Sequence, residues 1–365
     1  MNNNRLLSLD VMRGITIAGM ILVNNAGDWN YVYAPLRHAH WDGFTPTDMV
    51  FPFFMFMMGI SAYFSLRKYN FKWSRASLIK IVKRTVLIFL IGMFINLFGL
   101  VLNQGFDWEH WRILGVLQRL ALAYGFGSLI ALSINHKYLL HTAALLLLAY
   151  AGIVVGTNSL AMSPDSILAV IDRAVVGEPH MYRDVMDNGT NIAFEPEGIL
   201  SLMSSIAHVL IGMFVGKMIL ANKNKPEAIV RNLFVLGTVL LFTGLLFSYG
   251  VPVNKKIWSS TFVLVTCGFG SQLLALLMYM IDIRKKKKWT AFFEAFGINP
   301  LYLYVQSEIL GMAFSACGLC STVMDNVLTP VFGNYLASLV WALLFVALNF
   351  IPGYYLYKKQ VYIKI

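Results

Sequence analysis

"MVFPFFMFMMGISAYFSL", residues 49–66, is a run of 18 residues without a charged side chain. A helix needs roughly 20 mostly apolar residues to cross the hydrocarbon core of a bilayer. Thr45, Pro46 and Asp48 precede the run, and residues of these types are common at helix starts. The stretch therefore predicts a membrane-crossing helix over residues 46–66.

The rest of the chain repeats this pattern. The 365 residues are 58% hydrophobic and 13% charged, whereas soluble domains are roughly one quarter charged. We predict an all-α polytopic membrane protein, with about ten transmembrane helices forming one bundle and one domain over residues 1–365. Besides 46–66, the predicted spans are 9–27, 79–101, 113–133, 138–156, 198–220, 229–249, 259–282, 292–316 and 333–356.

Positive charge gives the predicted orientation. If Met1 is cytoplasmic and every run crosses, 21 of the 29 Lys and Arg residues fall on the inner side. Cytoplasmic loops of membrane proteins carry such an excess, so we expect both termini to be cytoplasmic. Cytoplasmic loops then account for the net charge of +11, and we expect no nucleic-acid partner. Residues 28–45 and 157–197 become external loops, and the apolar residues of the second predict an ordered cap.

Cysteines and the N-terminal segment give negative predictions. Cys317 and Cys320 form a lone C-G-L-C inside an apolar segment, so we expect packed small residues and no metal site. The first apolar run contains Asp10 and Arg13 and has no small-x-small cleavage pattern. We expect it to be an uncleaved first span.

Polar residues in the first span lie along one stripe. Asp10 and Arg13 are three residues apart, and Asn24 follows Arg13 by about three full helical turns. Ionisable residues at membrane depth normally face a cavity or a partner. The stripe is either part of a site or an internal ion pair plus a helix-end amide.

The first external loop contains "RHAHWDG", residues 37–43, with His38 and His40 as candidate bases. Imidazole titrates near neutral pH and is the usual general base. Asp48 follows closely, where it could orient an imidazole or only cap the following helix.

Three later helices carry further polar groups. In the fourth, Arg112, Gly115 and Arg119 are predicted on one face, where the arginines could bind phosphate or pack against Asp10 or Glu308. The sixth has small residues at helical spacing, which favours a packing seam with His208 as a weaker site candidate. The seam residues are Ser201, Ser204, Ser205, His208 and Gly212. In the ninth predicted helix, Asn299, Tyr302 and Gln306 share one face, and Glu308 lies on another.

Acidic groups outside and basic groups inside would suit an amine acceptor outside and an anionic donor inside. Acyl transfer across the membrane requires this arrangement, with a histidine to take the amine proton and an amide to bind the oxyanion. A sugar or proton-coupled transporter uses the same residue types, and no internal repeat is visible. An inactive scaffold is a third alternative.

Several segments together resemble the heparan-α-glucosaminide N-acetyltransferase family of transmembrane acetyltransferases. They follow one another along nearly the whole chain, and none is decisive alone. They are "LSLDVMRGITIAGMILVNNAG", "RHAHWDGFTPTDMVFPFFMFMMGIS", "RILGVLQRLALAY", "IDRAVVGEPHMY", "FEPEGILSLMSSI", "PVNKKIWSSTFVL" and "NPLYLYVQSEIL".

The resemblance implies an acetyl-CoA-dependent N-acetyltransferase acting on the amine of a glucosamine-type sugar. It selects His38 as the catalytic histidine, with Asn24 positioning the thioester or oxyanion and Asp48 orienting His38. His40 occupies a serine position of the family motif. The segment between Asn24 and His38 is three residues longer than the family pattern leads us to expect. Direct transfer and an acetyl-histidine intermediate both remain open.

The remaining expectations concern ligands and location. We expect the donor, acetyl-CoA, to contact Arg13, Arg112 and Arg119 from the cytosolic side, and no metal to take part. We expect a bacterial inner-membrane, multi-pass protein with a periplasmic acceptor site, as a monomer or a homodimer. The expected acceptor-binding residues are Trp41, Asp42, His180, Glu195 and Glu197.

Overall fold

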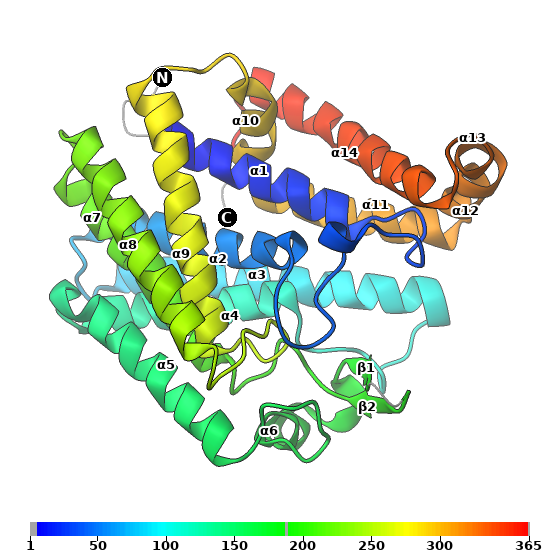
Figure 1. Ribbon diagram of the computed structural model, residues 1–365, viewed down its shortest axis with the longest axis horizontal. Helices are drawn as coiled ribbons and strands as arrows, with labels where there is room; N and C mark the ends of the chain where they lie inside the picture. Colours follow the sequence, from blue (N-terminus) through cyan, green and yellow to red (C-terminus); the bar gives the residue numbers. More distant parts are fainter. Residues whose placement is uncertain (1–5, 187–188, 364–365) are drawn as a thin grey trace.

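A computed structural model describes residues 6–186 and 189–363 and is almost entirely helical (Figure 1). Within these residues, nine helices are long and apolar enough to cross a membrane. This confirms the predicted all-α polytopic class. The nine are α1 (Leu7–Asn24), α2 (Val50–Leu66), α3 (Arg75–Gln104), α4 (Val116–Ser133), α5 (Leu139–Gly156), α7 (Leu202–Ala221), α8 (Pro226–Phe247), α9 (Ser260–Leu277) and α14 (Asn334–Lys358).

Three of these helices are extended by short helical turns. The 3-10 turn η2 (Pro46–Met49) leads directly into α2, and the π-helical turn η6 (Met278–Ile283) continues α9. The 3-10 turn η3 (Arg67–Tyr69) continues α2 at its other end, and η4 (His136–Tyr138) leads directly into α5. The predicted boundaries of most spans therefore agree with the structure to within a few residues.

The predicted span 292–316 is wrong as one continuous helix. It divides into α10 (Thr290–Ile298) and α11 (Pro300–Ala316), because Pro300 has no N–H for a helix continuing through Asn299. The Asn299 amide instead holds the C-terminal segment, donating to Val361 O over 2.9 Å and accepting from Ile363 N over 2.8 Å. The chain after α11 is also bent, by 73°, into α12 (Leu319–Val323), η7 (Met324–Leu328) and α13 (Thr329–Phe332).

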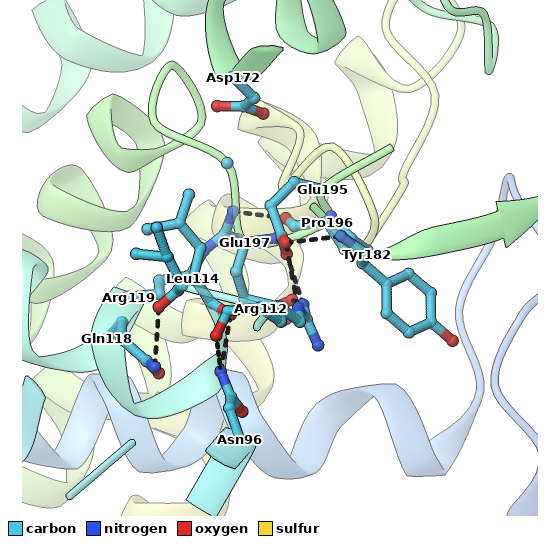
Figure 2. A network of polar contacts seen from close by, with 12 residues as sticks. Asn96, Arg112, Leu114, Gln118, Arg119, Asp172, Tyr182, Glu195, Pro196 and Glu197 are labelled. Atoms are coloured by element: carbon cyan, nitrogen blue, oxygen red, sulfur yellow. Dashed lines mark hydrogen bonds and ion pairs between the residues drawn. The ribbon is translucent and has the colours of Figure 1, made fainter. Parts of the chain in front are cut away.

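The fourth span also begins later than predicted. Gly115 is extended, with φ at 169°, and α4 starts at Val116, so Arg112 does not share a helical face with Arg119. Side chains take the carbonyls that a helix would use: Asn96 donates to Arg112 O and Leu114 O, and Gln118 donates to Ile113 O. Figure 2 shows these bonds.

The predicted seam on α7 packs against α2. A Cβ on Gly212 would lie 2.3 Å from Phe56 O, and a Cβ on Gly59 would lie 2.4 Å from Val209 O. The two backbones can approach this closely only because both positions lack a side chain. Ser204, Ser205 and His208 are fully buried beside this contact.

The described residues of the segment 157–197, which we call the cap, form regular elements. The cap contains α6 (Ile167–Val176), η5 (Glu178–His180) and an antiparallel hairpin of β1 (Arg183–Val185) and β2 (Asn191–Ala193). In Figure 1 these elements lie together at the bottom of the view, beyond the end of α5. Their apolar residues form a separate core with α5 and the α8–α9 loop: Tyr150, Val154, Leu168, Ala169, Ile192, Phe194 and Ile257.

Candidate active site

A cavity of about 480 Å³, which we call the outer cavity, lies on the side predicted to be external, where the loops meet the bundle. Its wall comes from α1, the loop before η2, η2 itself, the segment before α4, the cap, the α8–α9 loop and α11. Asn24, His38 and Asp48, the three candidate catalytic residues, all line it. The polar and ionisable residues of the wall are Asn24, His38, Thr47, Asp48, Arg112, Tyr182, Asp184, Glu197, Lys255, Lys256 and Tyr304.

His38 and Asp48 form a close pair in this cavity wall. His38 Nδ1 lies 2.6 Å from Asp48 Oδ1, and the Asp48 side chain is fully buried while the His38 side chain is 48% exposed. A carboxylate can only accept, so the contact assigns the proton to Nδ1. The neutral ring then presents the lone pair of Nε2, which is the arrangement of an oriented general base.

The other oxygen of Asp48 fixes its carboxylate to the backbone. Asp48 Oδ2 accepts from Ala39 N over 3.0 Å and from Thr45 N over 3.0 Å. Thr45 and Asp48 form a capping box at the start of η2, with Pro46 at the first helical position. Asp48 therefore caps the helix and holds His38 at once, so the two predicted roles do not exclude each other.

Lys255 is a third member of this group that the sequence analysis did not select. Its Nζ lies 3.1 Å from His38 Nδ1 and 3.4 Å from Asp48 Oδ1. The residue belongs to the loop between α8 and α9, far from His38 in sequence. Its one visible signal was a pair of lysines, Lys255 and Lys256, on the side predicted to be poor in positive charge.

Asn24 approaches the cavity from the end of α1. Its Nδ2 donates to Glu308 Oε1 over 3.1 Å, which gives Glu308 of α11 the partner that its position required. The amide nitrogen carries two protons, so one remains for a group in the cavity. Arg13 lies about three helical turns before Asn24 along α1. Its Nη1 pairs with Asp10 Oδ1 over 2.7 Å.

Arg112 pairs with two glutamates of the cap (Figure 2). Arg112 donates through Nη2 to Glu197 Oε2 over 2.7 Å, and through Nε to Glu195 Oε2 over 3.1 Å. Its guanidinium stacks on the ring of Tyr182, 4.7 Å from the centroid. Burial opposes the charge of Arg112, but the two carboxylates outweigh it and raise the arginine pKa.

The two glutamates differ in access. The Glu195 side chain is fully buried and also accepts from Tyr182 N and Glu197 N, so it is a structural partner of Arg112. Glu197 lines the cavity. Burial would raise the pKa of Glu197, but Arg112 beside it outweighs that effect and lowers it.

Arg119, the second predicted CoA ligand, is buried under the cap. It donates to Pro196 O over 2.5 Å and to the hydroxyl of Ser201, and its guanidinium lies 4.8 Å from the centre of the Trp258 ring. Arg112 and Arg119 thus bind the segment around Pro196 to the bundle. These contacts engage both arginines with protein groups.

Three expected acceptor-binding residues contact protein groups away from the cavity lining. Trp41 Nε1 donates to Leu160 O, and its ring packs on Phe194. Asp42 accepts from the Asn254 amide over 3.2 Å, and His180 Nδ1 lies 2.9 Å from Trp111 O. The cavity lining includes none of Trp41, Asp42 and His180, and of the five expected residues only Glu197 reaches it.

A second cavity, of about 320 Å³, lies toward the opposite end of the bundle. Three cations line it: Arg13 from α1 and Lys80 and Arg84 from α3. Arg84 Nε is buried without a hydrogen-bond partner among the described residues. The wall also includes Ser61, Asn299 and Tyr302.

A narrow apolar void of about 10 Å³ lies between the two cavities. It shares Phe54, Leu120 and Leu301 with the cationic cavity, and Met20, Phe51, Val116 and Tyr304 with the outer cavity. The two polar cavities are therefore separated only by a neck of side chains. No cluster of three or more metal-ligating side chains occurs within residues 6–186 and 189–363.

Known proteins are similar to this chain over most of its length. Residues 5–249 match the family described as "Heparan-alpha-glucosaminide N-acetyltransferase, catalytic". Heparan-alpha-glucosaminide N-acetyltransferase of Homo sapiens is 28% identical over 99% of this chain, and that of Mus musculus is 27% identical over 99%. The chain spans about 60% of the length of these relatives. The chain belongs to the heparan-alpha-glucosaminide N-acetyltransferase family, whose catalytic region it matches.

Proposed function

We propose that the protein transfers the acetyl group of acetyl-CoA to the amine of a glucosamine-type sugar. The acceptor occupies the outer cavity beside His38, and the donor reaches the same point from the cationic cavity at the other end. The oriented His38–Asp48 pair inside a cavity is the observation that carries this proposal. In a bacterial inner membrane the outer cavity would face the periplasm.

The cationic cavity suits the phosphates of CoA. Arg13, Lys80 and Arg84 line it, and guanidinium and ammonium groups are the usual protein ligands of phosphate. The neck of about 10 Å³ is too small for the pantetheine arm. Donor binding therefore requires side chains such as Met20 and Tyr304 to move, which opens a path to His38.

In the reaction, the acceptor nitrogen attacks the thioester carbonyl carbon and a C–N bond forms. His38 Nε2 takes the proton from that nitrogen, and Asp48 stabilises the ring cation. The free N–H of Asn24 donates to the carbonyl oxygen as it becomes negative. The C–S bond then breaks, and His38 returns the proton to the sulfur of CoA.

Both substrates are bound at once in this scheme, since they approach from separate cavities. Initial rates measured against both substrates should therefore give intersecting double-reciprocal lines. Parallel lines would indicate an acetyl-histidine intermediate instead.

Replacement of His38 by alanine tests the assignment. Purified His38→Ala should lose acetyl transfer to glucosamine by at least about 100-fold, while thermal stabilisation by CoA is retained. His110→Ala is the matched control, because His110 is an exposed loop histidine that pairs with Asp107. Transfer by His38→Ala at the wild-type rate would refute the proposal.

A transporter is the second candidate, because two polar cavities face opposite ends of the bundle across a neck. It predicts uptake of labelled sugar into proteoliposomes without CoA. The acetyltransferase predicts N-acetylated sugar only when acetyl-CoA is present.

A further inference from the structure

The loop between α8 and α9 brings a lysine against the proposed base. Lys255 Nζ lies 3.1 Å from His38 Nδ1 and 3.4 Å from Asp48 Oδ1, and its side chain is 23% exposed. Because the Nδ1 proton already points to Asp48, Lys255 cannot donate to Nδ1. The contact is therefore an approach of two nitrogens that would both be positive if the ring were protonated.

Asp48 and Lys255 act on the His38 ring in opposite directions. A carboxylate within hydrogen-bond distance favours the imidazolium form, and a nearby ammonium disfavours it. Burial lowers the pKa of Lys255, and Asp48 opposes that shift. His38 Nδ1 thus contacts one anion at 2.6 Å and one cation at 3.1 Å.

Other charged and titratable groups facing the cavity come from other elements and are mostly paired with one another. Lys256 donates to Asp184 over 2.6 Å, and Arg112 donates to Glu197 over 2.7 Å. Lys255 is the cation that contacts the His38–Asp48 pair directly. The full facing set beyond that pair is Arg112, Tyr182, Asp184, Glu197, Lys256 and Tyr304.

The backbone around Lys255 is held firmly. Trp258, fully buried, has a left-handed φ of 50° and its N–H donates to Lys255 O over 3.0 Å. Ser204 Oγ of the α7 seam donates to Trp258 O over 2.7 Å. A bulky residue in this conformation is uncommon and persists where the surroundings enforce it. The loop therefore has a fixed course past the site.

We propose that Lys255 is a positioning residue whose positive charge keeps His38 neutral, and so ready to accept a proton, at neutral pH. The catalytic meaning of this inference rests on the proposed function. The inference about protonation does not, and it can be measured without any acetyl transfer.

Reaction with diethyl pyrocarbonate reports the neutral fraction of an imidazole directly. The rate of modification of His38 would be followed by mass spectrometry against pH in the full-length purified protein. A His40→Gln background leaves His38 as the one histidine of the 37–43 peptide. The variants compared are Lys255→Met, Lys255→Gln, Lys255→Arg and, as the matched neighbour, Lys256→Met.

Loss of the charge in Lys255→Met and Lys255→Gln should move the midpoint of the modification curve upward by about one pH unit or more. Well below the midpoint this is roughly a tenfold slower reaction. Lys255→Arg should keep the wild-type midpoint, and Lys256→Met should move it by less than about 0.3 unit because that charge is paired with Asp184.

Two results would overturn the inference. An unchanged or lower midpoint in both neutral variants would mean that Lys255 carries no charge that His38 senses. An equal shift in Lys255→Arg would assign the effect to packing. Failure of the proposed function would be seen separately, as absence of acetyl-CoA-dependent product from wild-type protein whose His38 titrates as expected.

Discussion

The carboxylate of Asp48 joins the ring of His38 to the start of a helix: Oδ1 lies 2.6 Å from His38 Nδ1, and Oδ2 accepts the N–H groups of Ala39 and Thr45. The charge that orients the ring is therefore also part of the fold. Its replacement should affect both catalysis and stability, in separable ways.

Asp48→Asn should lower kcat by roughly 10²–10⁴-fold, since an amide cannot stabilise the imidazolium and can turn its NH₂ toward the ring. It should also cost about 1–2 kcal/mol of stability through the weakened cap. The measurements are the pH–rate profile and thermal unfolding. Asp325→Asn, at an exposed aspartate of η7, is the control. An unchanged rate and profile in Asp48→Asn would remove Asp48 from the mechanism.

Glu195 and Glu197 should separate into a structural and an acceptor-binding residue. Glu195→Gln removes the negative charge of a fully buried partner of Arg112. It should lower the free energy of unfolding by about 1–3 kcal/mol. Glu197→Gln should chiefly raise KM for the amino sugar, about tenfold, because Glu197 lines the cavity. Unfolding and acceptor saturation curves of both variants would check this. A larger KM effect from Glu195→Gln would reverse the assignment.

Arg84 should contribute to donor binding. Arg84→Gln is expected to raise KM for acetyl-CoA about tenfold with little change in kcat, because a charge-assisted phosphate contact is lost far from the reacting atoms. Lys83→Gln, an exposed neighbour on α3, is the matched control. Thermal stabilisation by CoA should weaken in Arg84→Gln alone. Equal effects in both variants would point to general surface charge.

Local pattern in the sequence was enough for the helices and for part of the site. Apolar runs predicted the spans, while helix spacing and the external loop made Asn24, His38, His40 and Asp48 candidates. The family resemblance then selected His38, and Asn24, His38 and Asp48 line one cavity. The break at Asn299 was missed although Pro300 is a local signal for it, because the segments on both sides are mostly apolar. The hydrogen bonds of Asn299 to Val361 and Ile363 have no local signal.

Long-range pairing explains the contacts in the site that the sequence analysis did not predict. That Arg112 binds CoA stays a prediction, but its carboxylate partners, more than 80 residues away in the cap, were not predicted. Lys255 reaches His38 across 217 residues of sequence. Lys80 and Arg84 were counted only as inner-side charges. Which charges meet is decided by tertiary packing, which periodicity does not encode.

The contact between α2 and α7 should be intolerant of side chains at its glycines. Gly212→Ala would place Cβ 2.3 Å from Phe56 O, so the helices must separate, and we expect a loss of about 1–3 kcal/mol. Gly152→Ala on α5, where a Cβ meets nothing within 4 Å, should be neutral or stabilising by up to about 1 kcal/mol. Thermal unfolding of the two variants checks the pair. Similar effects in both would contradict the close approach.

Asp172 should make stability depend on pH near neutrality. Its carboxylate, 1% exposed on α6, accepts from Ile199 N over 2.7 Å, and burial raises its pKa to about 6. In the unfolded chain the pKa is about 3.9, so the folded protein holds this proton more tightly. Stability should therefore fall as pH rises from about 4 to about 6, by about 2–3 kcal/mol, and remain lower above that window.

Asp172→Asn removes this titration while keeping an acceptor oxygen for Ile199 N. The variant should be more stable than wild type at pH 8, and the difference should shrink as the pH falls toward 4. Asp165→Asn, at an exposed position of the same cap, should show no such dependence. The measurement is the difference in Tm between each variant and wild type at several pH values. A wild type that becomes more stable between pH 4 and 6, relative to Asp172→Asn, would show that the Asp172 charge is favoured in the folded cap.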